Sequence, residues 1–267
     1  MSTTRSRVSR LSRRPRGRAG LAAALLLALG LAGCNTRSPE TTGSIGGLGA
    51  TGAVARGEID ALAERSKADP GDARLAIRYA RALRANDQAG QASAVLQQAA
   101  LRNPKDTALL GAYGKSLVEV GRYREAIEVL SNAHTPANPD WRILSAQGSA
   151  AAQMGEQGRA QGFYEAALKI RPNEPSLLSN LGLSYALSRN LDQAEQTLRL
   201  ADAQPGADAR VRANLALVLG LKGRYPEAEA VLRRDMGPAE AAANVAALRK
   251  LAAQPNRFKP EAATQRG

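Results

Sequence analysis

Few side chains in this 267-residue sequence are suited to acid–base, nucleophilic or metal chemistry. The chain has one histidine, His134, and one cysteine, Cys34, and they lie far apart in the sequence. A histidine that acts as a general base or metal ligand needs partner side chains, so we expect His134 to be a surface residue at a hairpin end. The glycine-rich stretch 43–49 is not followed by Lys-Ser or Lys-Thr, as a phosphate-binding loop would be.

These observations predict a protein that is not an enzyme, with no catalytic, cofactor-binding or metal-binding residues and no small-molecule substrate. The Asp and Glu residues are scattered at the spacing of solvated helix faces. The alternative is an enzyme whose titratable residues come together only in the folded chain, in a cleft and with shifted pKa values.

The residues before Cys34 have the composition of a secretion signal. Seven arginines and no acidic residue precede an apolar run of 12 residues at positions 21–32. Such a run is too short to cross the roughly 30 Å hydrocarbon core of a bilayer, but it suits the core of a signal peptide. We therefore expect residues 1–33 to be removed from the mature protein.

The tetrapeptide 31–34, Leu-Ala-Gly-Cys, resembles the lipobox of bacterial lipoproteins. This resemblance implies that Cys34 is the lipidation site, and that two or three acyl chains hold the protein at a membrane. By the same resemblance, Asn35 in place of aspartate favours the periplasmic side of the outer membrane over the inner membrane. The alternatives are an ordinary signal peptide that ends near a cysteine, or a twin-arginine signal around Arg13. Residues 34–55 are rich in Ser, Thr and Gly and predict a flexible tether.

The formal net charge of +13 invites a comparison with nucleic-acid-binding proteins. Seven of these charges lie in the predicted signal peptide, which leaves +6 on the mature chain. Aromatic residues make up 3% of the sequence, so bases would find few stacking partners. We expect no nucleic acid partner, and the remaining charge favours acidic protein surfaces or an anionic leaflet.

The mature chain repeats itself every 34 residues, five times, over 73–106, 107–140, 141–174, 175–208 and 209–242. A fixed period of this length predicts an all-α solenoid of helical hairpins, with one helix over about the first 14 residues of each repeat and a second over about residues 18 to 31. Three columns of residues keep the step: alanine at Ala92, Ala126, Ala160, Ala194 and Ala228; a small residue at Ala80, Gly114, Gly148, Gly182 and Ala216; and a large one at Leu96, Leu130, Tyr164, Leu198 and Leu232.

These columns resemble the tetratricopeptide repeat (TPR). The second repeat matches the pattern of that family at Leu110, Tyr113, Gly114, Leu117, Ala126, Leu130 and Ala133. Other repeats depart from this pattern. The family has an apolar residue at the positions of Gln147 and Arg212, a proline at the position of Gly206, and a small residue at the position of Asp235. Outside the repeats we expect an N-terminal capping helix in 56–72, a final alanine-rich helix over 238–253 with the C-terminal cap assigned to 243–257, and a disordered tail at 258–267.

The TPR resemblance implies that partners bind along the concave face, which the first helices of the repeats line. On that face we expect a peptide-binding groove with a basic N-terminal half and an amide-lined C-terminal half, formed by Arg74, Arg78, Arg81, Arg84, Lys115, Asn180 and Asn214. Amide side chains both donate and accept hydrogen bonds, which suits the backbone of an extended peptide. The alternative is that these residues belong to solvated helix faces. Trp141 is either a buried hairpin contact or an anchor for a partner.

The combination of lipobox, tether and repeats resembles the TadD lipoproteins of the Tad (Flp) pilus assembly system. The resemblance implies a scaffold for protein–protein interaction in pilus assembly, with pilus or secretin components as partners. The alternatives are an adaptor for another type IV pilus secretin, for insertion of outer-membrane proteins, or for peptidoglycan enzymes.

Overall fold

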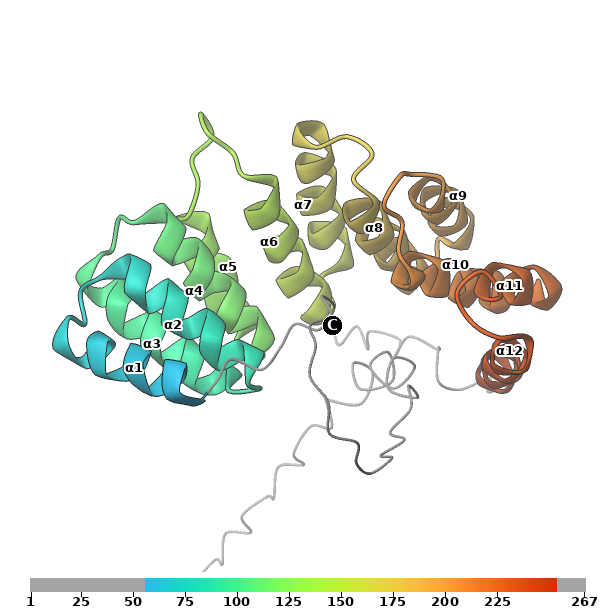
Figure 1. Ribbon diagram of the computed structural model, residues 1–267. Helices are drawn as coiled ribbons and strands as arrows, with labels where there is room; N and C mark the ends of the chain where they lie inside the picture. The colour runs from blue at the N-terminus through green and yellow to red at the C-terminus, as the bar shows by residue number, and fades with distance from the viewer. Residues whose placement is uncertain (1–55, 254–267) are drawn as a thin grey trace, which may run out of the picture. The chain divides into compact units, whose positions relative to one another are not determined.

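A computed structural model describes residues 56–253, and in this range the chain forms twelve α-helices and no β-strand (Figure 1). The all-α solenoid predicted from the 34-residue period is confirmed. The predicted signal peptide 1–33, Cys34 with the tether to residue 55, and the tail 258–267 lie outside the described residues. None of the described helices is both long enough and apolar enough to span a membrane.

Ten of the helices form five successive hairpins, one in each predicted repeat, and each hairpin packs against the next. The first helices start where the period places them and extend for 13 residues each: α2 (Ala73–Ala85), α4 (Thr107–Glu119), α6 (Trp141–Gln153), α8 (Pro175–Leu187) and α10 (Ala209–Leu221). The second helices are α3 (Ala89–Arg102), α5 (Tyr123–Ser131), α7 (Gln157–Ile170), α9 (Leu191–Asp202) and α11 (Tyr225–Leu232). Before and after the hairpins lie α1 (Arg56–Ala68) and α12 (Pro238–Ala252).

Local chemistry sets the start and the turn of each hairpin. An aspartate carboxylate caps the N-terminus of α2, α4, α6 and α10 by accepting a hydrogen bond from a backbone N–H of the first turn. The turn between the two helices needs a left-handed residue, and every repeat places one at the same position: Asp87, Gly121, Gly155, Arg189 and Gly223. Glycine adopts this conformation without strain, whereas at Asp87 and Arg189 the Cβ atom of the side chain makes the same conformation less favourable.

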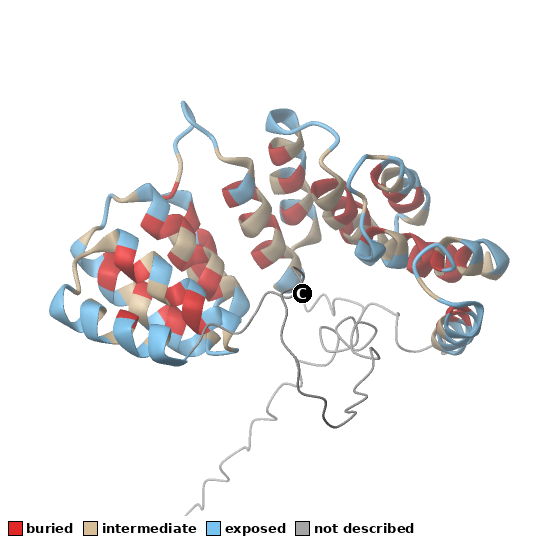
Figure 2. Cartoon of the chain, in the orientation of Figure 1, coloured by how far each residue is buried: buried red, intermediate tan, exposed pale blue. Residues whose placement is uncertain are grey.

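The small and large columns of the sequence meet each other in the core of each hairpin (Figure 2). A Cβ atom added to Gly114 would lie 2.5 Å from Leu130 Cγ, and one added to Gly148 would lie 2.6 Å from Tyr164 Cε1. Glycine is therefore required where the second helix sends a large side chain against the first, because the two backbones approach closely there.

Two of the second helices are shorter than the repeat predicts. The period placed the second helix of the second repeat near 124–137, but α5 ends at Ser131. Pro136 cannot donate a helical hydrogen bond, and the residue before a proline disfavours the α conformation, so the helix ends early and residues 132–140 form a loop. In the fifth repeat α11 likewise ends at Leu232, and a new helix begins at Pro238.

The departures from the TPR pattern are accommodated by polar contacts. Gln147 is 3% exposed, and its Nε2 donates a hydrogen bond to Ser131 Oγ over 3.2 Å. The two departures in the fifth repeat compensate each other, because the Arg212 guanidinium forms two hydrogen bonds with the Asp235 carboxylate.

Candidate binding groove

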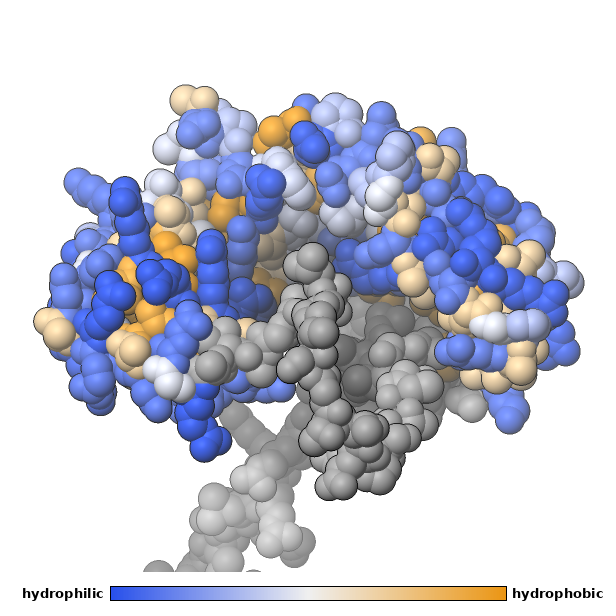
Figure 3. All heavy atoms as spheres, in the orientation of Figure 1, coloured by the Kyte–Doolittle hydropathy of each residue, from blue (hydrophilic) through white to orange (hydrophobic). Residues whose placement is uncertain are grey.

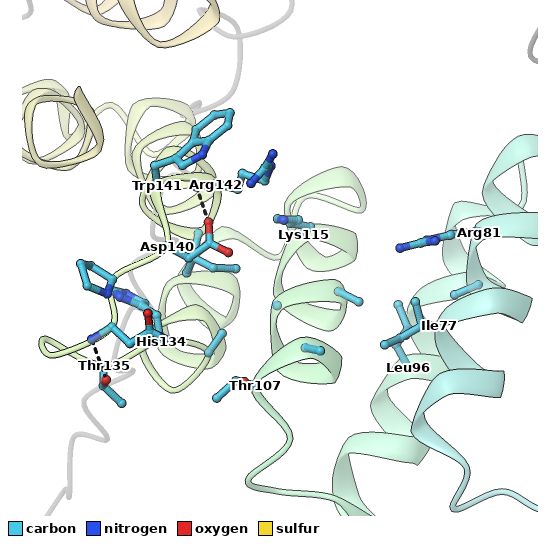
Figure 4. Close-up of a pocket in the computed structure, with 18 of the residues that line it drawn as sticks. Ile77, Arg81, Leu96, Thr107, Lys115, His134, Thr135, Asp140, Trp141 and Arg142 are labelled. Carbon is cyan, nitrogen blue, oxygen red and sulfur yellow. Dashed lines mark hydrogen bonds between the residues drawn. The ribbon is translucent and has the colours of Figure 1, made fainter. Parts of the chain in front are cut away.

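A groove of about 760 Å³ lies across the first helices of the first three repeats, α2, α4 and α6 (Figure 4). The loop 132–140 that follows the shortened α5 contributes its remaining wall. The 34-residue period brings the three first helices side by side, and the loop adds a fourth segment to the groove. In Figure 3 apolar side chains are visible over these N-terminal helices, flanked by hydrophilic ones.

The floor of the groove is apolar and made largely of small residues. Gly111 lies against Ile143, since an added Cβ would come within 2.9 Å of Ile143 Cδ1. Small side chains leave a hollow where larger ones would fill the space between helices. The other apolar and small residues of the floor are Ile77, Ala80, Leu96, Ala108, Ala112 and Ala133.

Four cationic side chains line the walls of the groove: Arg81 and Arg84 on α2, Lys115 on α4 and Arg142 on α6. The Arg84 guanidinium forms a two-pronged ion pair with the Glu119 carboxylate of α4. Among the described residues, Arg81, Lys115 and Arg142 have no ion-pair partner within 4 Å. Three positive charges in the groove are therefore not neutralised by the part of the chain that the structure describes.

The electrostatic environment of Lys115 reflects this crowding. Burial lowers the pKa of Lys115, the carboxylate of Asp140 opposes this effect, and Arg142, Arg84 and Arg81 lower the pKa further. The ammonium group therefore lies close to three arginines, whose repulsion the Asp140 carboxylate opposes. An anion entering the groove would relieve this repulsion.

The N-terminus of α6 presents an aromatic ring, a cation and an acid together at the groove. The guanidinium carbon of Arg142 lies 4.5 Å from the centroid of the Trp141 ring, which is a cation–π contact. Asp140 Oδ1 accepts a hydrogen bond of 2.7 Å from the Arg142 backbone N–H as the helix cap (Figure 4). The half-buried Trp141 ring also packs against the hydrophobic core, so it is both a hairpin contact and a part of the groove wall.

His134 lies in the loop at the end of the second hairpin, where the sequence suggested, and it also lines the groove. Its ring is half-buried in the loop after α5, and its Nδ1 atom is buried without a hydrogen-bond partner among the described residues. Its place in the groove follows from the early end of α5, because the residues after Ser131 turn toward α4 and α6 instead of continuing the helix. Within 56–253, no three His, Cys, Asp or Glu side chains are grouped in a way that could hold a metal ion.

The structure brings together three of the seven residues predicted for the groove, namely Arg81, Arg84 and Lys115. Arg74 and Arg78 lie exposed on α2 and do not line it. Asn180 and Asn214 lie on α8 and α10, half-buried and away from it, and Asn214 Nδ2 donates a hydrogen bond of 3.0 Å to Ser179 Oγ.

Sequence reasoning missed Arg142 and the contribution of the loop to the groove. The signal for the loop was Pro136, which lies within the segment near 124–137 that the period assigns to helix. Arg142 was also recognisable as a basic residue at the second position of a first helix, the face that the TPR pattern turns toward partners.

A scan against protein-family models found no match to this chain, and a search of curated proteins found none either. Solved structures do match it. PilF of Pseudomonas aeruginosa is 21% identical, over 76% of this chain and 88% of that one, with a TM-score of 0.53. PilW, described as a widely conserved type IV pilus biogenesis factor, is 20% identical over 76% and 88%, with a TM-score of 0.54.

A third structure, YrrB, is described as a TPR protein with an unusual peptide-binding site. It is 16% identical over 72% of this chain and 99% of that one, with a TM-score of 0.52. Identities this low establish the fold alone. The described helices therefore form a solenoid of tetratricopeptide repeats.

Proposed function

We propose that this protein is a non-catalytic adaptor that holds other polypeptides during assembly of a pilus at the outer membrane. The observation that carries the proposal is the groove across α2, α4 and α6, where unneutralised cations stand over an apolar floor. Such a surface suits contact with another protein, since it combines apolar area with charged groups that select a partner.

The fold supports the same role. TPR solenoids generally act as scaffolds for protein–protein interaction, and one of the similar structures, PilW, is described as a type IV pilus biogenesis factor. The finer assignment to the Tad (Flp) pilus rests on the resemblance of the sequence layout to TadD lipoproteins. The partners we propose are components of that pilus or its secretin, with no nucleic acid and no small-molecule substrate.

The membrane anchor in this proposal is a lipid on Cys34. Two or three acyl chains would hold the protein at the periplasmic face of the outer membrane, and the segment up to residue 55 would tether the solenoid. Replacing Cys34 by Ser should release the protein from the membrane fraction and reduce the number of surface pili. Sedimentation of the variant with membranes through an uncleaved leader would contradict the anchor.

The partner is tested by photocrosslinking from the position of Ala112, at the groove floor, in cells that make the full-length protein. Capture of a secretin or of a pilus subunit would support the proposal. Capture of an outer-membrane insertion factor or a peptidoglycan enzyme would favour the alternative adaptor roles. A matched crosslinker at Lys169, which is exposed on α7, controls for proximity alone.

A further inference from the structure

We propose that the groove across α2, α4 and α6 binds an extended acidic segment of a partner protein, and that this segment inserts one apolar side chain between its carboxylates. The inference rests on the proposed adaptor function and adds the chemistry of the bound segment. Three features of the groove support it: its unneutralised charge, its apolar floor, and the loop that opens it.

The charge of the groove lacks its complement within the described chain. Arg81, Lys115 and Arg142 have no ion-pair partner there, whereas the acids nearby are already engaged: Glu119 pairs with Arg84, and Asp140 caps α6. A guanidinium offers five N–H donors and an ammonium three, so each cation has donors left for a carboxylate. Acidic side chains on the partner would satisfy them.

The spacing of the cations fits an extended chain. Packed helices lie about 8–10 Å apart, so the path from α2 across α4 to α6 is about 20 Å long. An extended polypeptide rises about 3.4 Å per residue, and about six residues would cover that path. Carboxylates near the two ends and the middle of such a segment could reach Arg81, Arg142 and Lys115.

The floor between the cations suits one apolar side chain. Ile77, Ala112 and Ile143 line it, and the small residues beside them leave the space that a leucine-sized group would fill. Burying such a side chain adds to the free energy of binding and fixes the register of the segment, which charge alone does not.

The shortened α5 gives access to this floor. Because the helix ends at Ser131, the loop 132–140 forms a separate wall with His134 and Asn138 in it.

A peptide fits these features better than a nucleic acid does. Bases require flat aromatic surfaces to stack on, and the one Phe, Tyr or Trp side chain that lines the groove, Trp141, is covered on one face by the guanidinium of Arg142. The apolar floor also has no role in holding phosphates.

Trp141 is the only tryptophan of the chain, so its fluorescence reports directly on the groove. The full-length protein, purified in detergent, is titrated with a synthetic peptide of glutamates and serines that carries one central leucine and is long enough to span α2 to α6. We expect a saturable change in Trp141 fluorescence. Replacing the glutamates by glutamines, or the leucine by serine, should each weaken binding by about tenfold or more.

The site is tested with a triple variant, Arg81→Gln, Lys115→Gln and Arg142→Gln. Its control is the triple variant Arg102→Gln, Arg124→Gln and Lys169→Gln, which removes the same number of charges from exposed positions on α3, α5 and α7. Circular dichroism and the unfolding temperature establish that both remain folded. Peptide binding should fall by at least about tenfold in the first variant and stay within about twofold in the second.

Several outcomes would overturn the inference: equal binding of the glutamine peptide, equal losses in both triple variants, or no binding of the acidic peptide at all. A DNA oligonucleotide or inorganic phosphate that competes as well as the peptide would also overturn it, since the groove would then be a general anion site. Failure of the pilus assignment looks different, because the peptide would still bind in the groove while the Cys34→Ser variant left piliation unchanged.

Discussion

The first three repeats and the last two use their positive charges in opposite ways. Around the groove of α2, α4 and α6, three cations have no ion-pair partner among the described residues. Between the fourth and fifth repeats, each of the cations Arg199, Arg212, Lys222 and Arg224 is held by one or more carboxylates.

Glu195 is the centre of the paired region. Its carboxylate accepts hydrogen bonds from Lys222 Nζ at 2.6 Å, Arg224 Nη1 at 2.5 Å and Arg199 Nε at 2.9 Å. Two of these donors belong to the fifth repeat, so the cluster links neighbouring hairpins. These ion pairs stabilise the interface between two neighbouring repeats, and in a solenoid such interfaces contribute much of the stability of the whole fold.

The difference shows where charge is structural and where it is available for a partner. Paired cations add to the stability of the fold, whereas like charges left close together subtract from it. The groove therefore has a cost in stability that a bound acidic segment would offset. Substitutions in the two regions should separate these roles, since they are expected to change stability with opposite signs.

The largest effect is expected from Arg212→Ala in the paired region. The side chains of Arg212, Asp202 and Asp235 are only 14%, 15% and 16% exposed, so the variant leaves two largely buried carboxylates without this partner. We expect a loss of about 3 kcal/mol in the free energy of unfolding, measured by urea denaturation. The double variant Arg212→Leu with Asp235→Ala restores the usual TPR residues and should recover most of that loss. A single variant as stable as the parent would show that this cluster contributes nothing.

The next effect is expected from Glu195→Gln. Burial raises the pKa of Glu195, but the hydrogen bonds from Lys222, Arg199 and Arg224 outweigh it and lower the pKa to about 2. A depressed pKa means that the unfolded chain binds the proton more readily, so this stabilisation is complete above the usual value of 4.5 and is lost as the pH falls toward 2. At pH 7 the variant should lose about 2 kcal/mol.

The pH dependence gives the Glu195 prediction its control. Between pH 4.5 and 2 the parent should lose more stability than the variant, so the difference between them should shrink as acid is added. Glu165→Gln removes an exposed carboxylate on α7 that accepts a hydrogen bond from the Tyr185 hydroxyl, and it controls for the loss of one negative charge. A constant difference between parent and Glu195→Gln across this range would contradict the lowered pKa.

The two regions also differ in how much of their structure could be predicted from the sequence. The fold followed from the 34-residue columns because each column is a contact, such as Gly114 against Leu130. The sequence showed that Arg212 and Asp235 depart from the TPR pattern. It did not show that the two side chains pair with each other, because that depends on how two residues 23 positions apart face each other in the fold. In the groove, Arg81, Arg84 and Lys115 were predicted from their positions on first helices.

The rest of the groove depended on where one helix ends. Because α5 ends at Ser131, His134 lies in the wall of the groove. The repeat columns could not predict this helix end, since they describe what the repeats share and not where one repeat differs. Whether Asn180 and Asn214 contact a partner stays a prediction.

Arg189 is an exception within the paired half, and it gives a smaller effect. It lies exposed at the left-handed position of its turn, with φ of 63°, and has no ion pair among the described residues. If its charge is not structural, Arg189→Gly should stabilise the protein by about 1 kcal/mol by removing backbone strain. Asp87→Gly, at the same position of the first repeat, should gain less because aspartate tolerates this conformation better. Destabilisation by Arg189→Gly in thermal unfolding would show that its side chain is needed.

The smallest change, and the one that tests the comparison most directly, is expected from Lys115→Met in the groove. Methionine keeps the length of the side chain and removes a charge that burial and the neighbouring arginines disfavour, so stability should rise by about 0.5 kcal/mol at pH 7. Because the pKa of Lys115 is lowered in the folded protein, the unfolded chain holds this proton more tightly. The contribution of Lys115 to stability should therefore increase as the pH rises through its lowered pKa toward the usual 10.5, and the variant should lack that increase. Peptide binding should weaken in the same variant. A methionine that destabilised the fold would mean that Lys115 is structural, and the two halves of the solenoid would then use their charges alike.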